Sequence, residues 1–321
     1  MTWELIMPML EPSSRPRARA GNASRGERRP TDRHAYRRSV RIAASVVAAM
    51  LVVFAAPARG ALPRVASINL CTDQLVLRLA DPSQIVTLSW LSADPEESLL
   101  ADEAARYPLN YGTAEELLRY DPDVVVAGAF TGAYTRSLLR SLGYTVVDVM
   151  PELTVDDIES NLRVVARAIG RAERGEALIA EMRERIRHLE RTKPAEPVAA
   201  VVVRPGGFTA DAGSLAHTLM TLAGLRNVPA EQGLDRWGSL SVETLLRTPA
   251  ELLIVTPYRT DEPSLANAVL AHPALRAVAT RKTAIEIPGA YFGCGLPDSL
   301  DAVEIMRRAN ERLGAANGDA L

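Results

Sequence analysis

One sequence pattern occurs twice, as EELLRYDPDVVVAG from Glu115 to Gly128 and as ETLLRTPAELLIVT from Glu243 to Thr256. In each copy, leucines at helical spacing give way to a proline, which disfavours further helix, and then to a short apolar run. Each copy therefore predicts a helix, a turn and a buried strand. Two copies predict two lobes of similar build, and two α/β lobes that face each other suit the capture of a small ligand.

The segments around the two copies predict parallel sheets. In the first lobe, strands at 64–70, 84–90, 124–127 and 144–149 alternate with helices at 72–80, 95–107 and 134–142. Such alternation is typical of a parallel sheet covered by helices. The first of these helices has Thr72 as its candidate N-cap. In the second lobe we expect a strand at 198–203, a helix from about Ser214 and a last helix at 298–313.

Residues 154–191 predict an almost continuous helix, with Gly170 and Gly175 marking a break between its two parts. The second part, about 20 residues from Arg171, would be about 30 Å long, which is enough to reach from one lobe to the next. We therefore expect an α/β protein in which two similar parallel-sheet lobes are joined by one long helix, with a ligand cleft between them. The expected segments are an N-terminal extension and signal peptide at 1–60, an N-terminal lobe at 61–153, a linking helix at 154–193 and a C-terminal lobe at 194–321.

The N-terminal segment has the order of a secretory signal. Arg37, Arg38 and Arg41 precede an apolar run from Ile42 to Ala56, and small residues follow around Ala58. A membrane anchor is the alternative, but this run of about 15 residues is shorter than the roughly 20 that span a bilayer. Export would place the mature protein in the periplasm.

Charge argues against a nucleic-acid partner. Removing residues 1–60 takes away 11 arginines and 4 acidic residues, which leaves 26 basic and 35 acidic residues, a net charge of about −9. Such a balance provides no electrostatic basis for binding nucleic acid.

Aromatic residues make up only 5% of the chain, yet many follow a predicted strand. Because the carboxyl ends of strands in open parallel sheets form the ligand crevice, we expect these residues to line one surface. For each of them, packing in the core of a lobe is the alternative. The candidate ligand-binding residues are Trp90, Phe130, Phe208, Trp237, Tyr258, Arg259, Tyr291 and Phe292. Together they favour a flat, partly apolar ligand.

The sequence contains no convincing constellation for catalysis or metal binding. His188, His217 and His272 lie in or beside predicted helices, away from the strand ends, and do not converge on a metal site. Phosphate-binding glycine loops and a GxSxG nucleophile turn are missing. We expect no enzyme activity, no catalytic residue, no bound metal and no cofactor. An enzyme on the same two-lobed scaffold and a binding protein for bare metal ions are the alternatives.

The two cysteines follow predicted strands, Cys71 after the first and Cys294 after the last. Both can therefore face the cleft, in a compartment that permits disulfides. A disulfide between them would hold the last helix or loop against the first lobe. Two free thiols in contact with ligand are the alternative.

Four segments in order resemble those of the periplasmic ligand-binding proteins of ABC importers. They are RVASINLCTDQL, GTAEELLRYDPDVVVA, DRWGSLSVETLLRTP and YFGCGLPDSLDAVEIM. The resemblance covers Arg64 to about Leu313 and is to the group with a long helix between the lobes, above all to its vitamin B12-binding and ferric-siderophore-binding members. It implies a monomeric solute-binding component that delivers a corrinoid or an iron chelate, siderophore or haem, to an ABC permease and its ATPase.

The resemblance also implies roles for particular residues. Trp90, Trp237 and the Tyr291–Phe292 pair would line the cleft. Arg259 is the only basic residue among the aromatic positions, which argues against a ligand with several anionic groups.

Two acids, Glu115 and Glu243, would dock on arginines of the permease, one from each lobe. Glu116 is an alternative to Glu115, since the spacing from the preceding glycine favours Glu116 while the spacing to Pro122 favours Glu115. For both acids, simple stabilisation of a helix start is the alternative.

Overall fold

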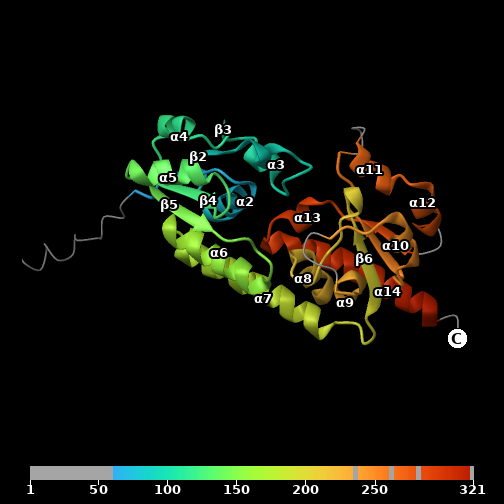
Figure 1. The fold of residues 1–321 in the computed structure, drawn as a ribbon. Coiled ribbons are helices and arrows are strands. Elements are labelled where there is room, and N and C mark those ends of the chain that lie inside the picture. The colour runs from blue at the N-terminus through green and yellow to red at the C-terminus, as the bar shows by residue number, and fades with distance from the viewer. Residues whose placement is uncertain (1–60, 234–237, 260–263, 280–282, 319–321) are drawn as a thin grey trace, which may run out of the picture. The chain divides into compact units, whose positions relative to one another are not determined.

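The computed structural model describes residues 61–233, 238–259, 264–279 and 283–318, without the side chains of 278–279 and 314–318. The predicted signal peptide at 1–60 lies outside these residues. The described residues form two parallel β-sheets, each flanked by helices (Figure 1). The two-lobed α/β fold that the sequence predicts is therefore confirmed, while the exact lobe boundaries stay predictions.

The first sheet has five parallel strands in the order β3–β2–β1–β4–β5. They are β1 (Val65–Ser67), β2 (Ile85–Ser89), β3 (Leu109–Asn110), β4 (Val124–Gly128) and β5 (Thr145–Val149). The lobe also contains the 3₁₀ turn η1 (Trp90–Ala93) and helices α2 (Leu70–Leu79), α3 (Ala101–Ala104), α4 (Ala114–Tyr120), α5 (Ala133–Ser141) and α6 (Val155–Ala168). β1 lies in the centre, because it pairs with β2 on one side and β4 on the other.

Helices cover both faces of this sheet. In β4, Val124 and Val126 belong to the core cluster that contains residues of α2 and α6, whereas Val125 and Ala127 belong to the cluster that contains residues of α4 and α5. Successive side chains of a strand point to opposite faces, so an uninterrupted apolar strand needs a cover on each.

The second sheet has four parallel strands in the order β7–β6–β8–β9. They are β6 (Val198–Val203), β7 (Leu225–Asn227), β8 (Leu252–Val255) and β9 (Thr283–Glu286). Around them lie the 3₁₀ turns η2 (Pro205–Gly207) and η3 (Pro297–Ser299) and helices α8 (Leu215–Leu222), α9 (Val228–Glu231), α10 (Val242–Arg247), α11 (Leu265–Leu270), α12 (Pro273–Ala279), α13 (Ala290–Gly293) and α14 (Leu300–Gly318). The central strand β6 is buried along its whole length.

The repeated segment folds in the same way in both lobes. Thr113 caps α4 and Ser241 caps α10, and each hydroxyl accepts a hydrogen bond from the backbone N–H three residues further on. Each helix then leads to a strand that pairs with the first strand of its lobe, β4 with β1 and β8 with β6. The predicted order of helix, turn and strand is confirmed in both copies.

The predicted continuous linker consists of two packed helices. After α6, Gly170 adopts a positive φ of 73°, which ends that helix, and α7 (Ala172–Arg191) packs against α6. The sequence predicts that Gly175 also marks the break, but Gly175 lies inside α7. A Cβ at Gly175 would come within 2.6 Å of the Ala166 side chain, so glycine allows the two helices to approach closely. With its 20 residues, α7 is about 30 Å long.

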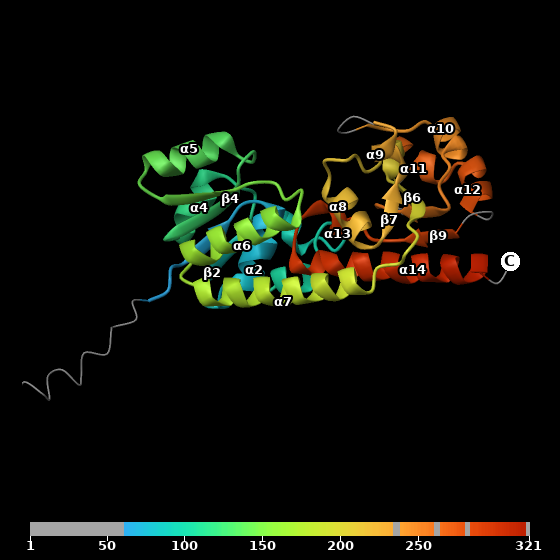
Figure 2. The ribbon, with the colours of Figure 1, turned by 90° about the horizontal axis from the view of Figure 1, so that it is seen from below.

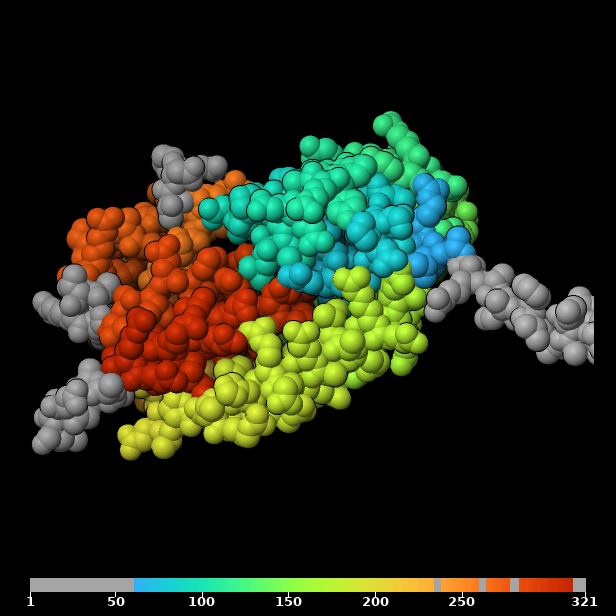
Figure 3. Space-filling model, turned by 180° about the vertical axis from the view of Figure 1, so that it is seen from behind, coloured from blue at the N-terminus to red at the C-terminus, as the bar shows by residue number. Residues whose placement is uncertain are grey.

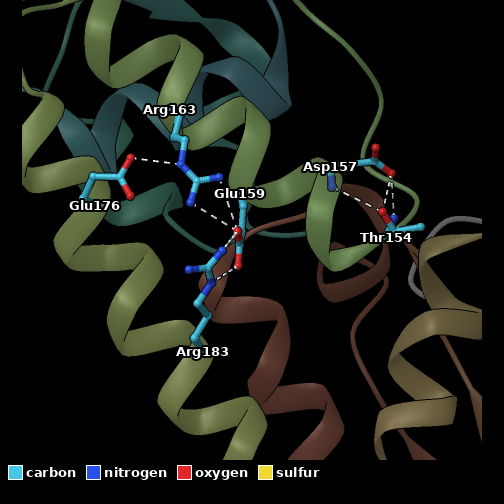
Figure 4. A network of polar contacts seen from close by, with 6 residues as sticks. All are labelled: Thr154, Asp157, Glu159, Arg163, Glu176 and Arg183. Carbon is cyan, nitrogen blue, oxygen red and sulfur yellow. Dashed lines mark hydrogen bonds and ion pairs between the residues drawn. The ribbon is translucent and has the colours of Figure 1, made fainter.

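Ion pairs attach α7 to both lobes. The Glu159 carboxylate of α6 accepts hydrogen bonds from Arg183 of α7 at 2.5 Å and from Arg163 at 3.3 Å (Figure 4). Further along α7, Arg185 pairs with Asp301 and Glu304 of α14 at 2.6 and 2.7 Å. The two helices α7 and α14 accordingly lie side by side (Figures 2 and 3).

Arg307 of α14 fastens the end of α7 to the second lobe. Its guanidinium is buried and donates to the carbonyls of Leu189 and Thr192, at the end of α7, at 2.8 and 2.6 Å. It also donates to the carbonyls of Leu222 and Ala223, at the end of α8, at 2.9 and 3.1 Å. One cation thus satisfies the terminal carbonyls of two helices, where positive charge is favourable.

Two local predictions are wrong. Asn69, not Thr72, is the N-cap of α2, because its side chain accepts from the N–H groups of Cys71 and Thr72. The helix expected at 95–107 is reduced to α3, since the Leu99 N–H donates to the Gln74 side chain at 3.0 Å and not to a helical carbonyl. The sequence analysis also missed the short elements β3, β7, α11 and α12.

Candidate functional site

Exposed aromatic side chains stand where three strands of the first sheet end. Trp90 follows β2 and is 44% exposed, Tyr111 follows β3 and is 73% exposed, and Phe130 lies just after β4 and is 79% exposed. The rings of Trp90 and Tyr111 lie 6.1 Å apart at an interplanar angle of 32°. Large apolar groups gathered at strand ends indicate a binding surface.

The sequence analysis missed Tyr111. The strand before it, Leu109–Asn110, has only two residues, which is too short to recognise from periodicity. One signal was available, because Tyr111 directly precedes Gly112, where one of the four resembling segments begins.

Buried polar groups hold the strand ends of this lobe. The Asp73 carboxylate of α2 accepts hydrogen bonds from the backbone N–H and the hydroxyl of Ser89, and burial raises the pKa of Asp73 to about 7. The Asn110 amide donates to the Ser67 carbonyl and to the Thr87 hydroxyl, both at 3.0 Å. Because these bonds join the ends of β1, β2 and β3, they also position the aromatic residues that follow.

In the second lobe, a rigid turn follows β6. The Arg204 N–H donates to the Phe208 carbonyl at 2.9 Å, and the Phe208 ring is 47% exposed. Inside the turn, Gly207 has a φ of 76°, and a Cβ there would lie 2.4 Å from the Leu240 carbonyl oxygen. Only glycine fits this position. Phe208 is one of the candidate residues predicted from the sequence.

The other predicted positions of the second lobe have different surroundings. Tyr291 is half-buried and packs against the core, while Phe292 is 6% exposed and belongs to the core cluster. The structure therefore does not bring Phe292 to the surface that carries the exposed rings, because α13 turns it inward. Trp237 lies outside the described residues.

Loops from the two lobes meet beside these strand ends. The Tyr258 hydroxyl, after β8, donates to Glu97 at 2.5 Å, and Arg259 forms an ion pair with Asp94, which directly follows η1. Arg259 Nε also donates to the Tyr258 hydroxyl at 3.0 Å. We call this cluster of Asp94, Glu97, Tyr258 and Arg259 the loop latch.

The contacts within the loop latch keep the Tyr258 hydroxyl and the Arg259 guanidinium protonated. The hydrogen bond to Glu97 raises the pKa of Tyr258, so its hydroxyl remains a donor. The Tyr258 hydroxyl and then the Asp94 carboxylate raise the pKa of Arg259. Since η1 begins with Trp90, the latch also brings the segment that carries Trp90 to the segment that carries Tyr258.

A second contact between the lobes is covalent. Cys71, near the start of α2, and Cys294, just after α13, form a disulfide with a Cα–Cα distance of 5.1 Å. The sequence left open whether the cysteines are bridged or free. On the same helix α2, Arg78 pairs with Asp298, with Nε and Oδ2 3.0 Å apart.

The two repeated acids occupy equivalent positions. Glu115 and Glu243 are each the second residue of their helix, and both are exposed. Glu116 has a different environment, because its carboxylate accepts from the N–H of Tyr111 at 2.9 Å and from the hydroxyl of Thr113 at 3.1 Å. The hydrogen bond from the Tyr111 N–H is the main cause that lowers the pKa of Glu116. Glu116 thus completes the capping box of α4.

A cavity of about 600 Å³ lies away from the strand ends, between α7 and α14, and is lined mainly by charged side chains such as Glu184, Arg185 and Arg308. Across the described ranges, no group of three or more His, Cys, Asp or Glu residues is arranged to hold a metal ion. A search of the same ranges finds no helix with the length and apolar character that a membrane crossing requires.

The family model for periplasmic binding proteins matches residues 65–285, which is more than half of the chain and includes most of both sheets. The chain belongs to this family. Members of the family bind small solutes in the periplasm and deliver them to membrane transporters. No curated protein matches the sequence.

Solved structures of similar fold include three binding proteins of known origin. The apo periplasmic heme-binding protein RhuT from Roseiflexus sp. RS-1 is 20% identical, with a TM-score of 0.63 over 77% of this chain and 98% of that chain. The periplasmic heme-binding protein HutB of Vibrio cholerae is 20% identical, with a TM-score of 0.63 over 78% and 98%. The vitamin B12-binding protein BtuF of Vibrio cholerae is 20% identical, with a TM-score of 0.60 over 78% and 97%. At this identity the likeness shows a shared fold.

Proposed function

We propose that this binding protein is the periplasmic solute-binding component of an ABC importer and captures a cobalamin-like or iron-chelate ligand, a siderophore or haem. The observation that carries the proposal is the exposed Trp90–Tyr111 pair at the strand ends of one lobe, joined through the loop latch to the strand ends of the other. Solved proteins of the same fold are named for binding haem and vitamin B12, which are flat macrocyclic metal complexes.

Binding of such a ligand requires no covalent chemistry. Apolar burial against the exposed rings contributes roughly 25 cal/mol per Å² of apolar surface removed from water. The Trp90 and Tyr111 rings can stack on a flat macrocycle, and the Tyr111 phenol oxygen is a type of group that coordinates ferric iron in some haem proteins.

The cellular setting is part of the proposal. A signal peptide within residues 1–60 would be removed on export, and the mature protein, with lobes at 61–153 and 194–321 and a linker at 154–193, would act as a monomer without enzyme activity. An enzyme on this scaffold would have to turn over its ligand, which incubation followed by mass spectrometry of the ligand would detect.

Titration of the tryptophan fluorescence with haem, cyanocobalamin and ferric siderophores tests the ligand class. We expect at least one of them to bind with a Kd below about 10 μM. Trp90→Ala and Tyr111→Ala should each weaken this binding by about tenfold or more, since each removes stacking surface. Tyr134→Ala is the matched control, because Tyr134 on α5 is 80% exposed but does not follow a strand. If none of these compounds binds, the proposed function is wrong.

We also propose that Glu115 and Glu243 dock on basic residues of the permease. Their equivalent exposed positions support this role, and the part of Glu116 in the capping box makes it the weaker candidate. Replacing both acids by alanine should reduce uptake in cells and leave the ligand Kd unchanged. Glu181→Ala with Glu190→Ala, two exposed acids of α7, provides the control. If replacing Glu115 and Glu243 abolishes ligand binding, the two acids face the ligand and not the permease.

A further inference from the structure

Arg204 differs from every comparable arginine in the described part of the chain. All other half-buried or buried arginines there have a partner for the guanidinium. The partners are carboxylates for Arg78, Arg136, Arg163, Arg171, Arg185 and Arg259, and backbone carbonyls for Arg307. The Arg204 side chain is half-buried, yet no hydrogen bond or ion pair connects its guanidinium, which still touches solvent, to any described residue.

Such an arrangement costs free energy. A guanidinium remains charged at any physiological pH, and partial withdrawal of a charge from water without a partner is unfavourable. Burial lowers the pKa of Arg204, and no neighbouring acid offsets this effect. An anion bound beside Arg204 would remove the penalty.

Arg204 lies where a ligand is expected. It directly follows β6, and Val203 at the end of β6 pairs with Val255 at the end of β8, from which the chain continues to Tyr258. The turn after Arg204 is held in place, because the Leu240 N–H donates to the Gly207 carbonyl at 2.9 Å. A side chain on a well-ordered turn loses little conformational entropy when it binds a ligand.

The second cationic group of this region is already neutralised. Arg259 pairs with Asp94 in the loop latch, so an incoming anion would have to displace a carboxylate to reach it. Arg204 has no such competitor among the described residues. Arg204 therefore adds a second basic residue to a region in which Arg259 is the only basic residue among the predicted aromatic positions.

We infer that Arg204 is a specificity-determining residue that binds an anionic oxygen group of the ligand, a carboxylate or a phosphate. This inference rests on the function proposed above and narrows the ligand class to compounds with such a group. A guanidinium is well suited to the task, because its planar set of donors matches two oxygens of one carboxylate or phosphate. The exposed Phe208 ring on the same turn offers an apolar surface beside it.

Matched pairs of ligands test the inference. Haemin and its dimethyl ester differ in their free carboxylates, and cyanocobalamin and dicyanocobinamide differ in a nucleotide loop that contains the phosphate. For the pair that the wild-type protein binds, Arg204→Gln should weaken binding of the anionic member by about tenfold or more and change binding of the other member by less than about twofold. Arg204→Lys should recover part of the loss, since it restores the charge without the planar donors.

The control is Arg276→Gln, which removes an exposed arginine of α12 in the same lobe and should change neither affinity. Thermal unfolding of each variant shows whether it folds. An equal loss for both members of a pair would mean that Arg204 supports the fold and not recognition, which overturns the inference. Unchanged affinity of Arg204→Gln for the anionic member overturns it as well.

Two outcomes in the wild-type protein separate the inference from the proposed function. Binding of neutral ferrichrome alone, without haemin or cyanocobalamin, would leave the proposed function standing and refute the role of Arg204. Binding of none of these compounds would refute the proposed function and the inference with it.

Discussion

The lobes are joined by two junctions that differ in their chemistry. One, which we call the linker junction, consists of α7 with its ion pairs, Arg307 and the Cys71–Cys294 disulfide. It contains a covalent bond and buried polar groups. The other is the loop latch, in which partly exposed acids meet Tyr258 and Arg259. Solvent screens such pairs, and exposed ion pairs contribute only about 0–1 kcal/mol.

The difference indicates which of the two junctions opens more easily. In the linker junction, the hydrogen bonds of Arg307 and Glu159 leave buried partners unsatisfied when they break, whereas water can replace those of the half-buried latch. If the proposed function is right, we expect a ligand to enter by opening the latch while α7 stays in place. The following variants test this asymmetry, in order of decreasing expected change.

Arg307→Met should have the largest effect. The variant leaves the terminal carbonyls of α7 and α8 without their donor, and the free energy of unfolding should fall by about 4 kcal/mol. Urea unfolding followed by circular dichroism measures this change. Arg308→Met, at the exposed neighbouring position, is the control and should stay within about 0.5 kcal/mol of the wild type. Similar losses in both variants would mean that α14 responds to any substitution.

Loss of the disulfide should have the next largest effect. In the double variant Cys71→Ser/Cys294→Ser, the free energy of unfolding should be about 3 kcal/mol lower than in the wild type. The reason is that the bridge closes a long loop in the unfolded chain. Reductant should destabilise the wild type to a similar extent and leave the double variant unchanged. A wild type whose urea midpoint does not respond to reductant would contradict this account.

Glu159→Gln should cost about 2 kcal/mol, since it weakens the charge-assisted hydrogen bonds from Arg183 and Arg163. The hydrogen bond from Arg183 is the main cause that lowers the pKa of Glu159 below its usual 4.5. The stabilisation is therefore present above that value and is lost as the pH falls through the lower pKa of the folded state. Unfolding curves of wild type and variant should converge below pH 4.5. A difference that persists undiminished at lower pH would exclude the carboxylate as its source.

The latch variant Asp94→Asn/Glu97→Gln should change the stability by less than about 1 kcal/mol, because its pairs are partly exposed. Its effect should appear in kinetics, as a several-fold faster release of bound ligand in stopped-flow fluorescence, since fewer bonds hold the lobes together. Asp102→Asn/Glu103→Gln on α3 is the control. A large loss of stability with unchanged release would reverse the roles of the two junctions.

Local sequence patterns predict the repeated units well. α4 with β4 and α10 with β8 follow from leucine spacing, a proline and an apolar run, all within about one turn of helix or one strand. β3 could not be predicted in this way, because a strand of two residues shows no periodic hydrophobic pattern. The packing of Gly175 against Ala166 escapes it as well, since a glycine that separates two helices and a glycine that lets them touch look alike in a sequence.

The residues of the candidate site also include some that the sequence predicts and some that it does not. Trp90, Phe208 and Tyr258 could be predicted because each follows a recognisable strand, and Tyr111 could not because its strand is too short. Phe292 satisfies the same rule, but the core takes up its side chain. Whether an aromatic residue at a strand end is exposed depends on neighbours that are distant in the chain.

Periodicity and turn residues act over short distances, so the amino-acid sequence predicts the alternation of strands and helices, the two similar lobes and the family of the protein. Which charges are satisfied depends on the three-dimensional fold. Arg259 finds Asp94 at a separation of 165 residues, whereas Arg204 finds no partner among the described residues. A guanidinium interacts with whatever folding brings within a few ångströms of it, and that depends on long-range packing rather than on local pattern.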